Sequence, residues 1–558
     1  MADTEAPVLI AGGSMAGLTA AAFLGQHGIR ALVVERHRGT AIHPRAALVY
    51  QRSMEILRSI GIEQAVRRRS YEQFEPDGAI MSVETLAGRE LNWDVAQLNQ
   101  AVRDLSPTER LFVTQDALEP MLNRRAEELG AELRFGAELA SWEQDGEGIR
   151  AVIRERDTDQ SFTVRAGYLI AADGGRSQIR ERLGIPMVGH GLLSRSVTIY
   201  FRADVGPLLR GRNLSVILVR NPTFRGFFRI EKPYQSGFLI VHMLGDPDEP
   251  VTDIWDVTEK RCVELIHAGL GDDDLPITVE DVQRWECRAD VAPSFRQDRV
   301  FLVGDAAHVM PPYGGFGGNV AIQDAHNIAW KLGMVLNGRA GAGLLATYEP
   351  ERRPVSELTV EQAYMRYVLR AALHLQGELT QPFVKDDNID LGYRYHSAAV
   401  MSEGDGAVHE DPRECRGRPG TRAPHIVLTQ AEKQISTHDL LGRGFVLFVG
   451  PEGSGWREGA LRAASQLHLD LDVHMIDGAS DLRDPSGRFL AGYGITGGGA
   501  VLVRPDGFVA WRATGAADSP AEAIAGVLSS ILHREPGRDT ARASLRPDRF
   551  GAMTGRVT

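Results

Sequence analysis

The stretch VLIAGGSMAG, residues 8–17, joins a short apolar run to a glycine-rich turn near the start of the chain. Its apolar part, residues 8–11, is typical of a buried strand, and the residues that follow predict a helix over 18–28 and a second strand over 31–35. Strand, helix and strand in this order predict a β-α-β unit, the building block of a parallel sheet covered by helices.

The glycine-rich turn fits the fingerprint of a dinucleotide-binding site. In that fingerprint glycines allow a tight turn and a close approach of the pyrophosphate, and the helix N-terminus attracts its negative charge. Glu35 ends the second strand, where an acid binds the ribose hydroxyls of the adenosine half. This acid favours a dinucleotide site over a turn without a ligand, although Ser14 stands where the middle glycine normally does. The candidate contacts are Gly12, Ser14, Met15, Ala16, Gly17 and Glu35.

Two further motifs follow predicted strands. Asp173 begins a glycine turn after the strand expected over 166–172, and such a turn is equally common in proteins without a ligand there. The run over 304–332 combines a strand ending in Asp305, a glycine loop and an amphipathic helix. Amides at the start of such a helix favour the negative charge of a reduced flavin, and Asp305 can accept hydrogen bonds from ribityl hydroxyls. This run therefore predicts a flavin site.

Composition limits the remaining function classes. The 558 residues exceed the usual size of a single core, so two or three domains are expected. A net charge of -12 disfavours nucleic acid and anionic membranes as partners. The three cysteines have neither paired nor metal-ligand spacing, and no apolar stretch reaches the length of a membrane helix. The sequence thus predicts a cytoplasmic protein without a structural metal.

Residues 7–375 resemble the class A flavoprotein aromatic hydroxylases, the family of para-hydroxybenzoate hydroxylase and phenol hydroxylase, since all three motifs occur in the family's order. The chain is most similar to the polyketide-tailoring branch that acts on anthracycline and angucycline rings. The runs HPRA (43–46), SMEIL (53–57) and VRPDG (503–507) support that branch. Ser14 and Val320 depart from the family pattern, because glycine is usual at both positions.

The resemblance implies an α/β fold with a Rossmann-like FAD-binding domain, an inserted antiparallel-sheet substrate domain and a C-terminal thioredoxin-like domain. No redox cysteine pair is present in the last domain, because Cys415 is the only cysteine after Cys287. The expected division is an FAD-binding domain over 1–80, 105–190 and 290–375, a substrate domain over 81–104 and 191–289, a linker over 376–421, a thioredoxin-like domain over 422–534 and a tail over 535–558.

The resemblance also assigns residues to a noncovalent FAD. Glu35 and Arg36 would bind the adenosine ribose and phosphate region, Arg45 and Gln115 the pyrophosphate and ribityl chain, and Asp305 the ribityl hydroxyls. The remaining candidates, near the flavin ring or in the three motifs, are Asp173, Gly304, Pro312, Gly315, Gly317, Gly318 and Asn319. His308 is expected to belong to the scaffold of its loop.

The implied activity is hydroxylation of an aromatic polyketide or related polycyclic phenol by NADPH or NADH and O2, through a flavin C4a-hydroperoxide. The rivals are a Baeyer–Villiger or antibiotic-inactivating oxygenase on the same fold, a reductase or dehydrogenase that inserts no oxygen, and a flavin-binding partner protein. We expect a small aromatic substrate and O2 as partners, and a homodimer is compatible with the sequence.

The substrate is expected between the flavin and the middle sheet. Phe201, Phe227 and Phe228, together with a helix over 364–374, are the candidate lining. Arg370 is the candidate catalytic residue, because a cation in the pocket would lower the pKa of a phenol. Arg366 and Arg370 share a helix face, which is also typical of solvated or paired arginines.

Overall fold

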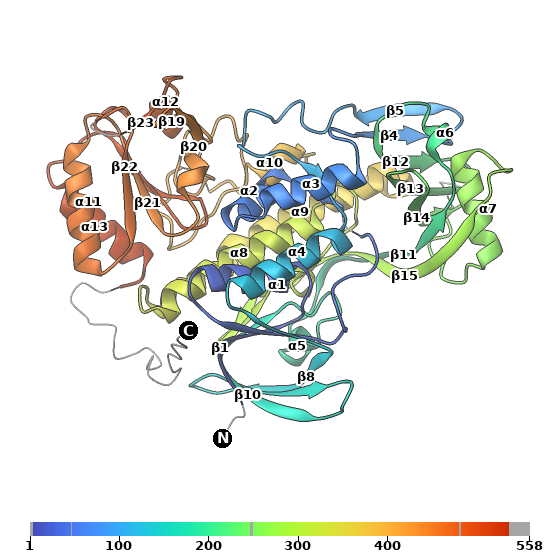
Figure 1. Ribbon diagram of the computed structural model, residues 1–558, viewed down its shortest axis with the longest axis horizontal. Helices are drawn as coiled ribbons and strands as arrows, with labels where there is room; N and C mark the ends of the chain where they lie inside the picture. Colours follow the sequence, from blue (N-terminus) through green and yellow to red (C-terminus); the bar gives the residue numbers. More distant parts are fainter. Residues whose placement is uncertain (1–3, 46, 246–248, 405, 479–480, 535–558) are drawn as a thin grey trace, which may run out of the picture.

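The computed structural model describes residues 4–45, 47–245, 249–404, 406–478 and 481–534. It has a mixed α/β fold with separate sheets, as predicted from the β-α-β unit and the family resemblance (Figure 1). The second sheet and the C-terminal unit lie at opposite ends of the molecule, with long central helices between them (Figure 1). Ala46 of the 43–46 motif and the predicted tail over 535–558 lie outside the described residues.

The first sheet is mainly parallel and contains the predicted β-α-β unit. Its central strand is buried from residue 8 to residue 11, because it has neighbouring strands on both sides. In order across the sheet the strands are β16 (Arg296–Gln297), β17 (Val300–Leu302), β10 (Ser161–Ala171), β1 (Thr4–Ala11), β2 (Ala31–Glu35) and β7 (Glu132–Phe135), with β9 (Ile149–Glu155) beside β10 and β8 (Ala137–Gln144) beside β9.

Helices of the first sheet's domain fill the centre of the molecule. The helix of the β-α-β unit begins at Met15, three residues before the predicted start at residue 18, so part of the glycine-rich turn is already helical. It contacts both α4 and α8. The helices are α1 (Met15–Gln26), α2 (Gln51–Ser59), α3 (Glu63–Gln73), α4 (Gln115–Glu128), α5 (Gln178–Arg182), α8 (Gly317–Leu336) and α9 (Tyr348–Arg370).

The second sheet has two different faces. Alternate residues of its strands enter the main core or a separate core under α7, because successive side chains of a strand point to opposite faces. In order, the strands are β18 (His308–Val309), β15 (Thr278–Val291), β11 (Val188–Arg202), β14 (Ser236–Leu244), β13 (Phe224–Glu231), β12 (Leu214–Arg220), β4 (Ala79–Val83) and β5 (Glu90–Val95), accompanied by the helices α6 (Gly206–Leu209) and α7 (Glu259–Leu270).

The C-terminal unit shares a hydrophobic core with α8. Trp330 and Met334 of that helix pack into the same cluster as Phe445 and Trp456. One sheet holds β22 (Leu471–Met475), β21 (Phe445–Val449), β24 (Ala500–Val503) and β25 (Val509–Ala513), and the other holds β20 (Lys433–Ser436), β19 (Val427–Gln430) and β23 (Leu482–Arg483). Its helices are α11 (Ser454–Leu467), α12 (Phe489–Tyr493) and α13 (Pro520–Ile531).

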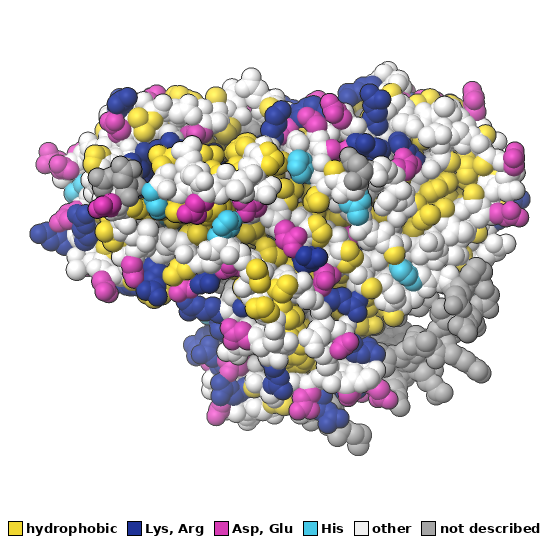
Figure 2. Space-filling model, turned by 180° about the vertical axis from the view of Figure 1, so that it is seen from behind, with side chains coloured by type: hydrophobic (Ala, Val, Ile, Leu, Met, Phe, Trp, Pro, Cys, Tyr) yellow, Lys and Arg dark blue, Asp and Glu magenta, His cyan; other side chains and the backbone are white. Residues whose placement is uncertain are grey.

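Short elements connect these parts. They are β3 (Leu48–Val49), β6 (Leu111–Phe112), the helix α10 (Asp386–Asp390) and the 3-10 turns η1 (Gly304–Ala306), η2 (Ala342–Thr347), η3 (Leu373–Glu378) and η4 (Thr437–Leu440). In the part of the chain that the structure describes, no helix is long and apolar enough to cross a membrane. Basic and acidic side chains are interspersed over the face in Figure 2, so that face has no large region of a single charge sign.

A buried ion network joins the C-terminal unit to the central helices. The Glu351 carboxylate on α9 accepts hydrogen bonds from Lys331 Nζ at 2.7 Å, from Arg504 Nη1 at 2.6 Å and from Ser397 Oγ at 2.6 Å. All three charged side chains are fully buried. Burial by itself would raise the pKa of Glu351, but the two cations outweigh it and lower that pKa. Because a buried charge is tolerated only with a partner, this network fixes how the C-terminal unit sits on α8 and α9.

We predict that Glu351→Gln lowers the free energy of unfolding by about 3–5 kcal/mol, because it leaves the buried Lys331 without a carboxylate and Arg504 with Asp506 alone. Differential scanning calorimetry measures the loss as a lower unfolding temperature. Arg339→Gln is the matched control, since the Arg339–Asp470 pair joins α8's end to the C-terminal unit but is exposed and should contribute little. Equal, small effects of both substitutions would contradict a structural role for the buried network.

Candidate active site

The three sequence motifs meet at one edge of the first sheet. Gly12 follows β1, Asp173 follows β10, and Gly304 follows β17. These three strands are parallel neighbours, so their carboxyl ends lie side by side. In open α/β sheets ligands bind in the crevice outside the carboxyl ends of the strands. The fold therefore brings together residues that are up to about 290 positions apart in the sequence.

The first motif needs glycine at two positions because the backbone is crowded there. Gly12 has φ of +110°, and a Cβ at this position would lie 2.1 Å from the Ala172 carbonyl oxygen. A Cβ on Gly17 would lie 1.9 Å from the Gly12 carbonyl oxygen. Both glycines are thus required for close packing between the turn, the helix and the neighbouring strand, as the fingerprint predicts.

The third motif packs directly on the first. Gly304 has φ of +58°, and a Cβ there would lie 3.3 Å from the Cβ of Ala16. Arg180 joins the second motif to the third, because its Nη1 donates to the Gly175 carbonyl at 3.2 Å and to the Ala306 carbonyl at 3.1 Å. The three loops therefore form one continuous surface.

Glu35 is bonded to the glycine turn itself. Its Oε2 accepts from the Gly13 amide at 2.7 Å and its Oε1 from the His37 amide at 2.8 Å. Each carboxylate oxygen has two lone pairs, so capacity remains for ribose hydroxyls. Arg36 is exposed beside it, with Nε 3.3 Å from the ring of His37.

Ser14 takes part in a hydrogen-bond network around Glu119, a residue that the sequence analysis missed. The Ser14 hydroxyl donates to Glu119, and the same carboxylate accepts from the Met15 amide at 3.2 Å, from Gln115 Nε2 at 2.7 Å and from the Ala41 amide at 2.7 Å. Its position four residues after Gln115 could have revealed it, because such residues share a helix face. Ser14 is therefore more than a tolerated replacement for glycine.

Arg45, Gln115 and Asp305 come together although they are far apart in the sequence. The Gln115 amide donates to the Arg45 carbonyl at 3.0 Å. Asp305 is accessible to solvent, yet the surrounding protein desolvates it and raises its pKa, against the opposing charges of His308 and Arg45. None of the described residues donates a hydrogen bond to this carboxylate, which leaves it available to ligand hydroxyls.

Asp173 is more enclosed than Asp305. Its Oδ2 accepts from the Ile179 amide at 3.2 Å, and its Oδ1 is buried without a partner among the described residues. Burial raises its pKa, although Ser177, Ile179 and Arg180 oppose that effect. The second motif therefore contributes a carboxylate with a free oxygen next to the glycine turn.

His308 belongs to the scaffold of the third motif, as expected. Its Nε2 lies 2.7 Å from Oδ2 of Asp324, which also accepts from the Gly304 amide at 3.0 Å. The other oxygen of Asp324 accepts from Arg352 Nε at 2.7 Å. Burial would raise the pKa of Asp324, but Arg352 and His308 outweigh it and lower that pKa. These buried bonds hold the start of the loop to α8 and α9.

The N-terminus of α8 offers backbone groups to a ligand. The helix begins with Gly317 and Gly318, which are partly accessible, and Gly315 before it has φ of +69°. The Asn319 side chain is fully engaged with protein, since Oδ1 accepts from the Tyr50 amide at 2.9 Å and Nδ2 donates to the Gly315 carbonyl at 2.8 Å. Asn319 can therefore serve a flavin through its amide and the shape of the loop.

The third motif continues into a cluster of aromatic rings. Tyr313 follows Pro312, which is half-buried, in the loop before α8. Its ring centroid lies 6.0 Å from that of Phe227 on β13, 5.3 Å from that of His242 on β14 and 5.8 Å from that of Tyr367 on α9. One loop thus supplies both candidate flavin contacts and part of an aromatic surface on the second sheet.

Two polar atoms in this aromatic cluster have no partner among the described residues. They are His242 Nε2 and the Tyr367 hydroxyl, both buried. The other ring nitrogen of His242 lies 3.0 Å from the Ser196 hydroxyl. Burial lowers the pKa of His242 to about 3, so its ring is neutral at physiological pH. The cluster therefore combines buried aromatic rings with two polar atoms that have no hydrogen-bond partner among the described residues.

The expected lining of phenylalanines is only partly correct. Phe227 faces the cluster, but Phe228 is its neighbour on the strand and points to the other face. There Phe228 packs edge-on against Phe201, at 5.9 Å between centroids, in the core under α7. Phe201 and Phe228 thus belong to the far side of the sheet.

The two arginines of α9 have different surroundings. Arg366 is buried, pairs with Asp386 and donates to the Val384 carbonyl at 2.7 Å, so it is a structural residue. The helix ends at Arg370, earlier than the predicted end at residue 374. Arg370 is half-buried, and no described carboxylate pairs with it. Its catalytic role stays a prediction.

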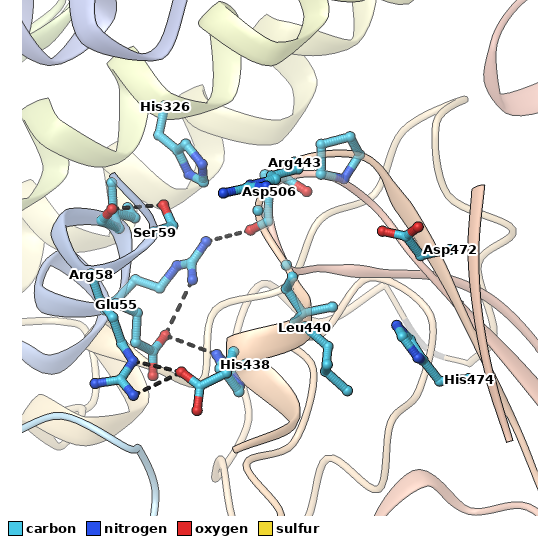
Figure 3. Close-up of a pocket in the computed structure, with 17 residues that line it drawn as sticks. Glu55, Arg58, Ser59, His326, His438, Leu440, Arg443, Asp472, His474 and Asp506 are labelled. Carbon is cyan, nitrogen blue, oxygen red and sulfur yellow. Dashed lines mark hydrogen bonds and ion pairs between the residues drawn. The ribbon is translucent and has the colours of Figure 1, made fainter. Parts of the chain in front are cut away.

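A cavity of about 530 Å3 lies elsewhere, between α2, α8 and the C-terminal unit (Figure 3). None of the predicted cofactor residues lines it. Its wall includes Glu55, which pairs with Arg422 and lies 3.7 Å from the neutral ring of His438, and Arg58, which pairs with Asp439. The chemistry of the motifs, rather than this cavity, therefore identifies the candidate active site.

Comparison with known proteins agrees with this geometry. Residues 5–363 match the family described as FAD binding domain, and residues 416–534 match the family described as aromatic-ring hydroxylase, C-terminal. The chain is 51% identical over 539 residues to 4-methyl-5-nitrocatechol 5-monooxygenase of a Burkholderia species, covering 95% of this chain and 98% of the relative. It is 38% identical over 562 residues to tetracenomycin A2 monooxygenase-dioxygenase of Streptomyces glaucescens, covering 96% and 98%.

A solved structure is similar over nearly the whole chain. The complex of aklavinone-11 hydroxylase with FAD and aklavinone superposes with a TM-score of 0.90 at 38% identity, covering 96% of this chain and all of that one. The likeness to polyketide-tailoring hydroxylases inferred from the sequence is thus confirmed. The first family match alone spans more than half of the chain. The chain therefore belongs to the FAD-dependent aromatic-ring hydroxylases.

Proposed function

We propose that the protein inserts one oxygen atom of O2 into the ring of a phenolic substrate, with FAD bound noncovalently and NADPH or NADH as reductant. One observation carries the proposal. The loop that starts at Asp305 supplies candidate flavin contacts, and the same loop places Tyr313 in the aromatic cluster of the second sheet. A ring bound against that cluster would therefore lie next to the flavin site.

The residues at the carboxyl edge fit FAD. The N-terminus of α1 would face the pyrophosphate, the carboxylate of Asp305 would accept from ribityl hydroxyls, and Arg45 would balance phosphate charge. When bound and reduced by the nicotinamide, FAD supplies O2 activation for transfer of an oxygen atom. The protein itself must hold the substrate ring and exclude water.

The aromatic cluster is suited to holding a substrate ring and to excluding water. Tyr313, Phe227 and Tyr367 offer ring faces, and the neutral His242 offers a polar atom in a site without water access. A buried neutral imidazole can accept a hydrogen bond from a phenol hydroxyl, which orients the ring. We expect His242 to position the substrate, with Arg370 near the edge of the cluster as the candidate that stabilises a phenolate.

The relatives' names give two substrate sizes. The relative at 51% identity is named for a monocyclic nitrocatechol, and those at 38% for polycyclic polyketides. The feature that they share is an oxygenated aromatic ring, which favours ring hydroxylation over Baeyer–Villiger oxygenation of a ketone. Three buried, unpaired cysteines fit a cytoplasmic protein. The proposed partners are the aromatic substrate, the nicotinamide and O2.

A substrate screen tests the proposal. The full-length, FAD-loaded protein is mixed with NADPH or NADH and a panel of monocyclic and polycyclic phenols and catechols. We expect at least one of them to accelerate nicotinamide oxidation and to yield a product heavier by one oxygen atom, measured by mass spectrometry. Acceleration without any oxygenated product across the panel would favour a reductase and contradict the proposal.

We predict that Asp305→Ala weakens FAD binding by about 1–3 kcal/mol, because ligand hydroxyls lose their acceptor in a desolvated position. Titration of the apoprotein with FAD, followed by flavin fluorescence, gives the Kd of the variant and the wild type. Asp157→Ala is the control, because this carboxylate is exposed and pairs with Arg38 on the surface. The same Kd for all three proteins would rule out Asp305 as a flavin contact.

We also predict that FAD leaves the chain completely on denaturation, because none of the described cysteines lies in a motif and His308 is fixed inside the protein by Asp324. Heat or acid precipitation followed by absorbance of the supernatant measures the released flavin. Yellow colour that remains with washed, precipitated protein would indicate a covalent bond and refute this prediction.

A further inference from the structure

Two arginines face each other across the hairpin of β12 and β13. Arg220 and Arg225 are direct cross-strand partners, so their side chains lie on the same face of the sheet. Leu218 and Phe227 lie two residues from them on the same strands, and both belong to the main core on the flavin side. Since side chains alternate between faces, Arg220 and Arg225 also point to the flavin side. Like charges placed directly opposite each other destabilise a sheet.

Neither arginine is neutralised by a carboxylate of the described residues. Arg220 Nε is buried without a hydrogen-bond partner. Arg225 donates only to backbone carbonyls, those of Asn221 and Phe224. Burial lowers the pKa of Arg225 and the charge of Arg220 lowers it further, with Tyr313 opposing them. In the same domain Arg212 pairs with Glu90, whereas no carboxylate of the described residues pairs with Arg220 or Arg225.

A third cation approaches from α9. Burial raises the pKa of Tyr313, and Arg370, Arg220 and Arg225 all act electrostatically on its hydroxyl in the opposite direction. Three guanidinium groups thus lie within electrostatic range of the Tyr313 hydroxyl. The chain as a whole is acidic, with a net charge of -12. The local excess of positive charge is therefore opposite in sign to the net charge of the protein.

Building on the proposed function, we propose that the substrate binds as an aromatic anion whose negative charge is held by Arg220 and Arg225, with Arg370 beside them. The substrate class is then a phenol that carries a carboxylate, or one acidic enough to be a phenolate at neutral pH. Planar guanidinium groups bind such oxygens in pairs, and a bound anion removes the repulsion between the two arginines. The neighbouring rings distinguish this site from one for a bare phosphate.

The positive charge near the aromatic cluster would also affect the ionisation of the substrate. A phenolate ring is richer in electrons than the neutral phenol, and nearby cations favour the ionised form. The three arginines would therefore select the ionised substrate and hold its ring in the orientation that the aromatic cluster sets. Arg220 and Arg225 act here as specificity-determining residues.

Matched pairs of phenols test this inference. The probes are 4-methyl-5-nitrocatechol against 4-methylcatechol, and 1-hydroxy-2-naphthoic acid against 1-naphthol. The first member of each pair is anionic at neutral pH, through a nitro group that acidifies the phenol or through a carboxyl group. Kd values come from the change in flavin absorbance of the FAD-loaded, full-length protein. We expect wild type to prefer the anionic member of a pair, and Arg225→Gln or Arg220→Gln to weaken its binding by about tenfold or more. Binding of the neutral member should stay nearly unchanged.

The unfolding temperature and the KM for NADPH distinguish substrate binding by the two arginines from a structural role and from a role in binding NADPH. Because the substitution removes a like-charge contact, the unfolding temperature of Arg225→Gln should equal or exceed that of wild type. Arg202→Gln, an exposed arginine of β11 paired with Glu280, is the control and should change no Kd. Equal losses for both members of each pair would overturn the inference, as would a raised KM for NADPH with unchanged phenol binding. Failure of every probe to accelerate nicotinamide oxidation would instead contradict the proposed function.

Discussion

The Asp324 carboxylate is the contact on which the candidate site depends. It holds the Gly304 amide and His308 with one oxygen and Arg352 with the other, in a position without water. Glu351 directly precedes Arg352 on α9 and binds Lys331 and Arg504. Adjacent residues of one helix thus fix the flavin loop on one side and the C-terminal unit on the other. Buried charges are stable only with their partners in place, so these networks leave little freedom in how the three parts meet.

The sequence predicted those parts of the site that depend on local spacing. A strand and the turn that follows it determine the glycines of the first motif, Glu35 at the end of β2, and Asp305 in the 3-10 turn after β17. It could not predict which partners the side chains choose. Glu119 reaches Ser14 and Met15 because α4 packs against α1, a contact between segments about 100 residues apart. Tertiary packing decides such contacts.

The second sheet is another part of the fold that the sequence predicted only in part. The family resemblance implied an antiparallel sheet in this part of the chain, but the side of the sheet to which each residue points depends on the register of its strands. Phe227 and Phe228 are neighbours in the sequence, yet Phe227 points toward the flavin side and Phe228 toward α7. The pairing of Arg220 with Arg225 likewise exists only once the hairpin is formed. The features that bear most on substrate choice are therefore those that sequence patterns describe least well.

In the proposed reaction an oxygen atom from O2 enters the ring of an aromatic substrate at a flavin held by the three loops. Isotope labelling tests it most directly. A substrate that accelerates nicotinamide oxidation is turned over under 18O2 in ordinary water, and separately under ordinary O2 in 18O-labelled water, and the product is examined by mass spectrometry. We predict that the new oxygen carries the label in the first experiment and lacks it in the second. A product labelled only from water, or one without a new oxygen, would contradict it.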